Sequence, residues 1–316
     1  MRTFIFNPYY ESYSAFNFEQ KGNCMVLIGE RIHIISREVN DAIKARNNKV
    51  IQYLAKSQAQ AGADYIDLNL GPAKKDPEEV TTWLVNTIQE VIDLPLSIDT
   101  LNPVAMEAGL KACNKRPLLN SASGKAVSKS LMLPLAKKYD TDVVISVITD
   151  EGCPPDVDAR TKSIMETVAY ANELGIPNED IWVDPVILPI SVDQKQVREA
   201  LEFIHILSDL LPGVKSTVGL SNVSNGTPAD LRGILNHTYM VMLKRNGLYS
   251  AIADVLDEEL VRLNRDDMPE VVDLIYKVMD GESINMSSLL QAEQDYVKTA
   301  RVLMGEVLYS HAWLEG

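Results

Sequence analysis

Residues 216–225 read Ser-Thr-Val-Gly-Leu-Ser-Asn-Val-Ser-Asn, and this stretch decides the fold. A short apolar run breaks at Gly219 and ends in a cluster of hydroxyl and amide side chains. Buried strands are rich in β-branched residues, and Gly, Ser and Asn are typical of the turn that follows a strand. Parallel α/β folds place their chemistry at the carboxyl ends of strands. If the protein is an enzyme, we therefore expect Asn222 to face the reacting atom.

Apolar runs of the same kind alternate with helical segments from Met25 to Val255. The runs cover residues 25–31, 65–71, 95–100, 118–124, 142–149, 181–189, 216–222 and 250–255. The helical segments cover about 39–61, the stretch from Pro77, 103–113, 127–139, 159–174, 193–210 and 229–245. This alternation predicts right-handed crossovers and a parallel sheet. Eight units in 316 residues favour an α/β fold of the (β/α)8 TIM barrel type over an open doubly wound sheet. An open sheet of that kind usually has a glycine-rich phosphate loop after its first strand, and GERIHI has none.

Segments at both ends lie outside this alternation. We expect an N-terminal arm over 1–24, a barrel domain over 25–264 and C-terminal helices over 265–316. The arm is rich in Phe and Tyr, which favours packing under the barrel over disorder. Residues 257–282 and 287–314 each have a helical pattern. Such helices would pack on the barrel flank or dock a partner.

Composition and charge narrow the class of function. With 30 Lys and Arg against 44 Asp and Glu, the net charge of −14 disfavours a nucleic-acid partner. The three cysteines form no CxxC pair, which argues against a disulfide scaffold or a zinc site and is consistent with the cytoplasm. The four histidines form no HxH or HExxH motif, so we expect no metal. No segment has the apolar character of a secretory signal or a membrane span.

Carboxylates and amides follow the apolar runs, where the barrel mouth would lie. Each could cap a helix or hold a turn instead of binding a ligand. For Asp67, Asn69 and Asp254 this structural role is at least as well supported as a role in binding. Together they suit a ligand rich in N–H donors, such as the pyrimidine edge of a pterin. In such a site Asp99 and Asp184 would accept hydrogen bonds. The strand-end residues are Glu30, Arg31, Asp67, Asn69, Asp99, Asn120, Ser121, Asp184, Ser221, Asn222 and Asp254.

Six of these strand ends resemble one family in the right order. GERI, YIDLNLGP, SIDT, LLNSASG, VDPVILP and VGLSNVS are similar to the motifs of methyltetrahydrofolate:corrinoid protein methyltransferases. These are pterin-binding barrel enzymes related to the folate module of cobalamin-dependent methionine synthase. The resemblance covers about residues 27–257. It implies a homodimer that uses tetrahydrofolate or 5-methyltetrahydrofolate as substrate, with the corrinoid (cobalamin) held on a partner corrinoid protein.

The resemblance also implies roles for individual residues. Asn222 would reach N5, the pterin atom that carries the methyl group. Because asparagine cannot be the final source of a proton, we expect a solvent chain that ends at Asp184 or Asp99 to supply it. Where other members have Gln, this chain has Asn225, and His33 replaces an Asn that often follows GERI. The residues expected to bind the folate are Asp67, Asp99, Asn120, Asp184, Gly219, Ser221, Asn222, Asn225 and Arg232.

Three functions are consistent with the sequence. The methyltransferase could run in either direction, and it would need an external corrinoid, because no histidine belongs to a DxHxxG signature. A dihydropteroate synthase would need a basic diphosphate pocket, but Lys215 precedes the seventh run at its wrong end. A binding subunit without activity could bind folate and only dock a corrinoid protein.

Overall fold

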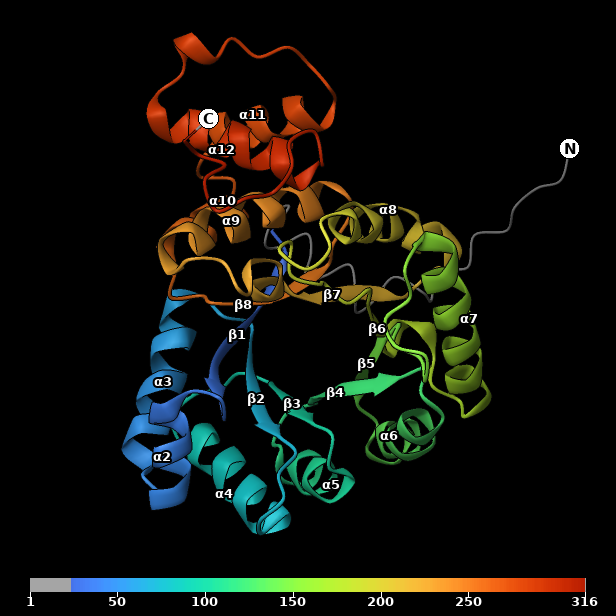
Figure 1. The fold of residues 1–316 in the computed structure, drawn as a ribbon. Helices are drawn as coiled ribbons and strands as arrows, with labels where there is room; N and C mark the ends of the chain where they lie inside the picture. Colours follow the sequence, from blue (N-terminus) through green and yellow to red (C-terminus); the bar gives the residue numbers. More distant parts are fainter. Residues whose placement is uncertain (1–23, 316) are drawn as a thin grey trace, which may run out of the picture.

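The computed structural model of the protein describes residues 24–315. Eight parallel strands pair in sequence order, and the last pairs with the first, so the sheet closes into a barrel (Figure 1). The predicted (β/α)8 TIM barrel is confirmed. The strands are β1 (Val26–His33), β2 (Tyr65–Gly71), β3 (Leu96–Thr100), β4 (Leu118–Ser123), β5 (Asp142–Ser146), β6 (Ile181–Asp184), β7 (Lys215–Gly219) and β8 (Ser250–Ala253).

Helices follow the strands and form the outer ring (Figure 1). They are α2 (Arg37–Ala45), α3 (Asn48–Ala61), α4 (Pro77–Gln89), α5 (Pro103–Ala112), α6 (Ala126–Tyr139), α7 (Val157–Glu173), α8 (Lys195–Leu210) and α9 (Ala229–Arg245). Two short 3-10 turns, η1 (Asn178–Asp180) and η2 (Leu220–Ser224), precede β6 and follow β7. The single helix expected over 39–61 is wrong, because Arg46 adopts a left-handed conformation with φ of 50° and separates α2 from α3.

Three further helices complete the described chain. They are α10 (Glu258–Asn264), α11 (Pro269–Met279) and α12 (Gln291–Leu303), with the short turn η3 (Met286–Ser288) between the last two. The continuous helix expected over 257–282 is interrupted at Asp266, which has a φ of 59°. The helix expected to reach Leu314 ends at Leu303, because Gly305 turns the chain with a φ of 76°.

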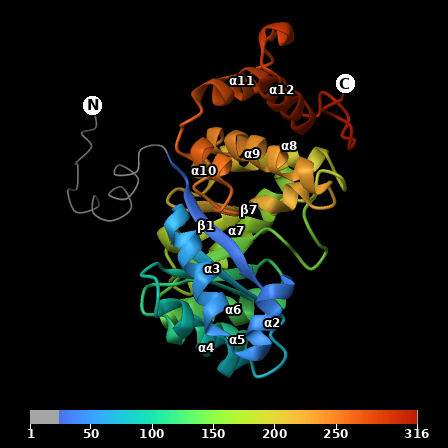
Figure 2. The ribbon, with the colours of Figure 1, turned by 90° about the vertical axis from the view of Figure 1, so that its left-hand side faces the viewer.

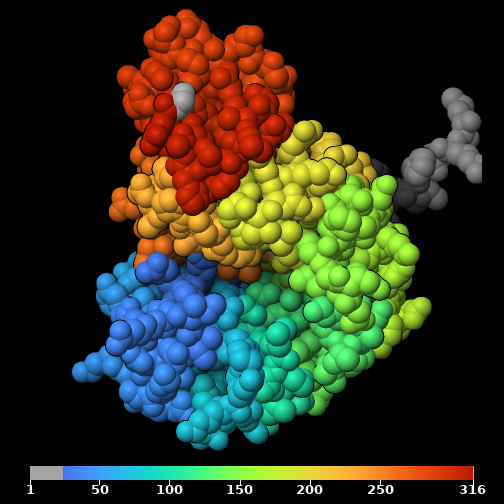
Figure 3. All heavy atoms as spheres, in the orientation of Figure 1, coloured from blue at the N-terminus to red at the C-terminus, as the bar shows by residue number. Residues whose placement is uncertain are grey.

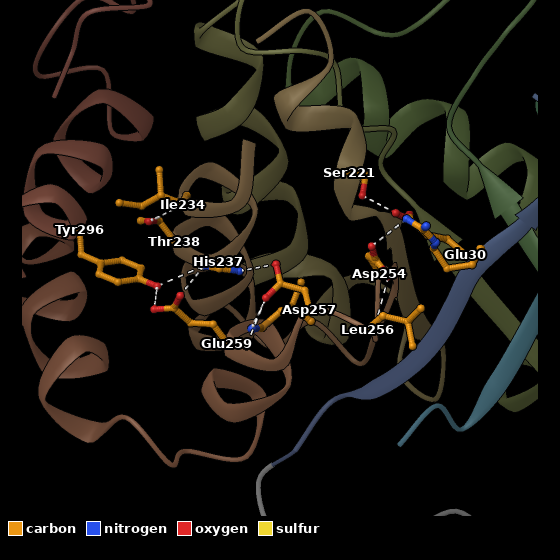
Figure 4. A network of polar contacts seen from close by, with 12 residues as sticks. Glu30, Ser221, Ile234, His237, Thr238, Asp254, Leu256, Asp257, Glu259 and Tyr296 are labelled. Carbon is orange, nitrogen blue, oxygen red and sulfur yellow. Dashed lines mark hydrogen bonds and ion pairs between the residues drawn. The ribbon is translucent and has the colours of Figure 1, made fainter. Parts of the chain in front are cut away.

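The C-terminal helices stand on α9, on one side of the barrel (Figures 2 and 3). His237 of α9 is buried, and its Nε2 lies 2.7 Å from Asp257 Oδ2. Its Nδ1 lies 3.1 Å from the hydroxyl of Tyr296 on α12, which donates to Glu259 at 2.9 Å (Figure 4). One polar network therefore joins α9, α10 and α12.

The amino end of the barrel is closed by an aromatic cluster. Trp182 is buried, and the rings of Tyr65 and Tyr249 pack edge-on against it at centroid distances of 5.6 and 5.2 Å. The ammonium group of Lys215 lies over the Trp182 ring and 3.4 Å from Asp142. A ligand of the barrel must therefore enter from the opposite end, where the strands finish.

The aromatic arm expected over 1–24 falls almost entirely outside the described residues. Between residues 24 and 315, no helix combines the length and apolar character that a membrane span requires. The same part of the chain has no group of three His, Cys, Asp or Glu side chains placed to hold a metal ion.

Candidate active site

The first part of the site is a cluster of carboxylates and amides from β2, β3 and β4. Parallel pairing places Asn69 opposite Asp99, and Asp99 opposite Asn120. Asp67 is 4% exposed and accepts hydrogen bonds from Ser97 Oγ at 2.6 Å and Asn120 Nδ2 at 3.2 Å. Asn69 Nδ2 donates to Asp99 Oδ2. The structure thus brings three of the predicted residues, Asp67, Asp99 and Asn120, into one polar cluster.

Asp184 is held by the turn that ends β6. Its Oδ1 accepts a hydrogen bond from the N–H of Val186 at 2.8 Å. Val186 has a φ of 62°, which is strained for a β-branched residue and typical of functional sites. The fully buried Arg160 of α7 donates from Nε to the carbonyl of Pro185 at 3.1 Å, so it fixes the same turn.

The opposite wall comes from η2 and the start of α9. Arg232 donates to Asn225 Oδ1 at 3.3 Å, and Asn225 Nδ2 donates to Asn222 Oδ1 at 3.2 Å. Because arginine can only donate, this chain orients both amides and leaves Asn222 Nδ2 as the remaining donor. A Cβ on residue 219 would lie 2.8 Å from that nitrogen, so Gly219 provides its space.

Ser221 and Arg232 tie this wall together. Arg232 also donates to Ser224 Oγ at 3.1 Å and to the Ser221 carbonyl at 3.4 Å. Ser221 Oγ donates to Glu30 Oε1 at 2.7 Å across the mouth (Figure 4). All nine residues expected to bind the folate therefore lie at the carboxyl end of the barrel.

Glu30 belongs to the site, although the sequence only placed it at a strand end without a role. The pairing of β1 with β2 shifts register between Gly29 and Ile32, which marks a β-bulge. Bulges beside active sites commonly redirect a side chain. The sequence feature that could have indicated this role is the charged pair Glu30-Arg31, which interrupts the apolar first run in GERI.

Burial raises the pKa of the carboxyl groups of Asp67, Asp99 and Asp184. Desolvation raises the pKa of Asp67 to about 6 against the effect of its donors Ser97 and Asn120. Desolvation also raises the pKa of Asp184 to about 6, against the opposing effects of the Val186 N–H and Arg160. The pKa of Asp99 lies well above its usual range, because desolvation acts together with the charges of Asp67 and Asp184. Acceptors crowded in this way favour a ligand that brings several N–H donors.

Residues 36–253 match the sequence profile of the pterin binding enzymes. The chain belongs to the pterin-binding enzyme family. This pterin-binding enzyme is 28% identical over 239 residues to methylcorrinoid:tetrahydrofolate methyltransferase of Eubacterium limosum, an alignment that covers 75% of this chain and 88% of that protein. It is 27% identical over 285 residues to methionine synthase of Mycobacterium tuberculosis, which covers 84% of this chain but only 23% of the synthase. The resemblance seen in the strand-end motifs is confirmed.

Solved structures share the architecture of this pterin-binding enzyme. Dihydropteroate synthase of Stenotrophomonas maltophilia superposes with a TM-score of 0.61 at 16% identity, covering 78% of this chain and 93% of that chain. The Xanthomonas albilineans enzyme in complex with 7,8-dihydropteroate gives a TM-score of 0.57 at 17% identity, with the same coverage. At these identities the likeness establishes the fold.

Proposed function

We propose that this enzyme moves a methyl group between N5 of tetrahydrofolate and the cobalt of a corrinoid held on a separate protein. The observation that carries the proposal is the oriented amide of Asn222, which keeps a free donor at the mouth of the barrel, where the carboxyl groups of Asp67, Asp99 and Asp184 are also gathered. The names of the relatives supply the two substrates, a methylcorrinoid and tetrahydrofolate. The proposal includes both directions of transfer.

The hydrogen-bond acceptors at the mouth of the barrel fit the pyrimidine edge of a pterin. Asp99 and Asp184 would accept from the amino group and the ring N–H groups of the ligand. Asn120 already donates to Asp67, and within residues 24–315 its Oδ1 remains for a ligand donor. Asp67 would hold Asn120 in this orientation. These residues position the ring so that N5 faces the η2 wall.

Asn222 would act on N5 itself. A tertiary amine is a poor leaving group unless its nitrogen gains proton character as the N–C bond breaks. A hydrogen bond from Asn222 Nδ2 that strengthens in the transition state lowers the barrier, because only interactions stronger in the transition state accelerate the step. Preorganised donors of this kind contribute roughly 3–4 kcal/mol.

The second substrate would come on a partner protein. No histidine of this sequence lies in a DxHxxG signature, so the corrinoid is carried elsewhere and must approach the open mouth. The net charge of −14 favours a partner with a basic docking face, and association should then weaken with salt. A homodimer, as in related enzymes, is part of the same proposal.

The dihydropteroate synthase reading receives no support from the site. It requires a cationic diphosphate pocket at the mouth, whereas Lys215 lies at the amino end of β7 and pairs with Asp142. Arg31, which is at the mouth, already pairs with Asp254 at 3.1 Å.

An anoxic absorbance assay with methyltetrahydrofolate and cob(I)alamin tests the proposal. We expect methylcob(III)alamin to form, and the Asn222→Ala variant to slow the transfer by about 10²–10³-fold. The matched control is Asn114→Ala, an exposed asparagine in the loop between α5 and β4 at the closed end of the barrel.

Folate binding, measured by calorimetry, separates the alternatives. Intact binding in Asn222→Ala with lost transfer supports the role in chemistry. Full transfer in that variant would contradict it. If the wild-type protein binds folate but transfers no methyl group to free cobalamin or to a corrinoid protein, it is a binding subunit and the proposed activity is wrong.

A further inference from the structure

We propose that Glu30 is the acid–base residue of this methyl transfer. Its carboxyl group would give a proton to N5 as the methyl group leaves, and would take that proton back when the reaction runs in the opposite direction. The inference rests on the proposed function. It gives Glu30 the proton-transfer role that was expected of Asp184 or Asp99 from the sequence.

A β-bulge places Glu30 at the mouth. One extra residue of β1 lies between Gly29 and Ile32, relative to β2. The N–H of Arg31 leaves the ladder and donates instead to Gln58 Oε1 at 2.9 Å. Residue 29 must be glycine at this point, because a Cβ would lie 2.5 Å from the same oxygen. Gln58 therefore holds the bulge open, and the bulge sets the direction of the Glu30 side chain.

Glu30 is hydrogen-bonded to the wall that carries the residue assigned to N5. Its Oε1 accepts the hydroxyl of Ser221 at 2.7 Å, and Ser221 immediately precedes Asn222 in η2 (Figure 4). Its Oε2 has no hydrogen-bond donor within residues 24–315. One oxygen is thus anchored to the wall that carries Asn222, and the other is left for a ligand.

The surroundings of Glu30 allow both protonation states near neutral pH. The charged groups that face it are Asp254 at the end of β8, Asp67 on β2 and Arg232 on α9. The pKa of Glu30 is raised to about 7, chiefly by desolvation. The charges of Asp254 and Asp67 contribute to this rise, and the Ser221 hydroxyl and the charge of Arg232 oppose it. An acid–base group works best when its pKa lies near the working pH.

The other carboxyl groups are already committed to holding the ring. Asp67 accepts two side-chain hydrogen bonds, Asp99 accepts one from Asn69, and Asp184 accepts the Val186 N–H. Their remaining lone pairs face the donors of the pterin in the proposed pose. Glu30 instead contacts the η2 wall, where its Oε1 accepts the hydroxyl of Ser221, the residue before Asn222. In the proposed pose N5 faces this wall.

The proposed step balances in atoms and charge. The N5–CH₃ bond breaks with both electrons staying on N5, and the electron pair of Co(I) forms the new Co–C bond. N5 takes the proton of the Glu30 carboxyl, which becomes a carboxylate and is reprotonated from solvent. In the opposite direction the lone pair of N5 forms the N5–CH₃ bond as the Co–C bond breaks, and the electron pair of that bond stays on cobalt as Co(I). The Glu30 carboxylate then takes the proton from N5.

Single-turnover methyl transfer measured from pH 5.5 to 8.5 tests this role. In the direction from methyltetrahydrofolate to cob(I)alamin, Glu30 must be protonated, so the wild-type rate should fall as the pH rises through about 7. In the opposite direction it must be ionised, so the rate should fall as the pH drops through the same value. Glu30→Gln should slow both by about 10²-fold and abolish that pH dependence. Glu38→Gln, an exposed carboxyl on α2, is the matched control and should behave as wild type.

The Asp254→Asn variant distinguishes an acid–base role of Glu30 from a purely structural one, because only an acid–base role would make the midpoint of the pH profile depend on this neighbouring charge. Removing this neighbouring negative charge should shift the midpoint of the pH profile to lower pH while the maximal rate is kept. A Glu30→Gln variant that retains the wild-type rate within about threefold, with the same midpoint, would overturn the proposal. If Glu30→Gln also loses folate affinity, an unshifted midpoint in Asp254→Asn would overturn it instead.

The two proposals fail differently. If the wild-type protein transfers no methyl group, the proposed function is wrong. If transfer occurs and depends on Asn222 while Glu30→Gln leaves the pH profile unchanged, only the role of Glu30 is wrong.

Discussion

Asn222 offers a donor to the mouth because two other side chains decide which way its amide faces. Arg232 can only donate, so it selects the oxygen of Asn225 and turns the Asn225 nitrogen towards Asn222 Oδ1. The amide nitrogen of Asn222 is then the donor that remains for a ligand, and the absence of a side chain at Gly219 makes room for it. Asn225 therefore determines the direction of the Asn222 amide.

Asn225→Asp tests this orientation. The new carboxylate would still pair with Arg232 but could not donate to Asn222 Oδ1, so the Asn222 amide would lose its preferred direction. We expect methyl transfer to slow by about tenfold in kcat, equivalent to one lost hydrogen bond of roughly 1.4 kcal/mol, with a smaller effect on KM. Asn114→Asp controls for the added charge. An unchanged kcat would mean that Asn222 is oriented without Asn225.

At the scale of the elements, buried Arg160 joins three segments around Asp184. It extends from α7 to the turn after β6 through the carbonyl of Pro185, and to α8 through Gln196. Gln196 in turn donates to the carbonyl of Pro155, in the loop before α7. The strained turn at Val186 therefore persists because the neighbouring elements determine its conformation.

Arg160→Met should loosen this arrangement. The carbonyl of Pro185 and the amide oxygen of Gln196 would lose their donor, which costs roughly 1–3 kcal/mol in the free energy of unfolding. The pKa of Asp184 should rise further, because the positive charge that lowers it is gone. Folate affinity at pH 7 should therefore weaken and recover as the pH is raised. Arg198→Met, an exposed arginine on α8, is the control. Equal stability of the two variants, measured by urea unfolding, would contradict the bracing role.

On the scale of the whole molecule, the barrel gathers carboxyl groups that the unfolded chain keeps apart. The raised pKa values of Glu30, Asp67, Asp99 and Asp184 mean that the folded protein binds more protons than the unfolded chain between about pH 4 and pH 7. Stability then falls as the pH rises through this window, since the slope follows the difference in bound protons. The unliganded enzyme thus gives up stability to maintain its binding site.

The free energy of unfolding should accordingly be higher at pH 5 than at pH 8 in the absence of folate. For Asp67, whose pKa rises from 3.8 to about 6, the loss over the whole titration is on the order of 3 kcal/mol, and roughly half of it falls between pH 5 and pH 8. Asp67→Asn should remove that part of the pH dependence and stabilise the protein at pH 8, while weakening folate binding. The exposed Asp209→Asn variant should do neither. Urea unfolding at several pH values measures both effects, and a pH-independent difference between Asp67→Asn and wild type would refute the explanation.

The sequence alone determined the barrel, its closed order of strands and nearly all of the polar residues at its mouth. The reason is that eight apolar runs, each ending in a polar residue, already specify which end of a parallel sheet holds the chemistry. Helix ends were harder, because the left-handed residues Arg46 and Asp266 have no sequence signature comparable to glycine.

Only the tertiary structure decided how those residues act on one another. Glu30 and Ser221 are 191 positions apart and meet only when the barrel closes. The bulge that aims Glu30 depends on Gln58, a side chain of the neighbouring helix α3. Burial next to other carboxyl groups is likewise a property of the closed barrel, so the pKa of Glu30 near 7 could not be read from the order of the residues.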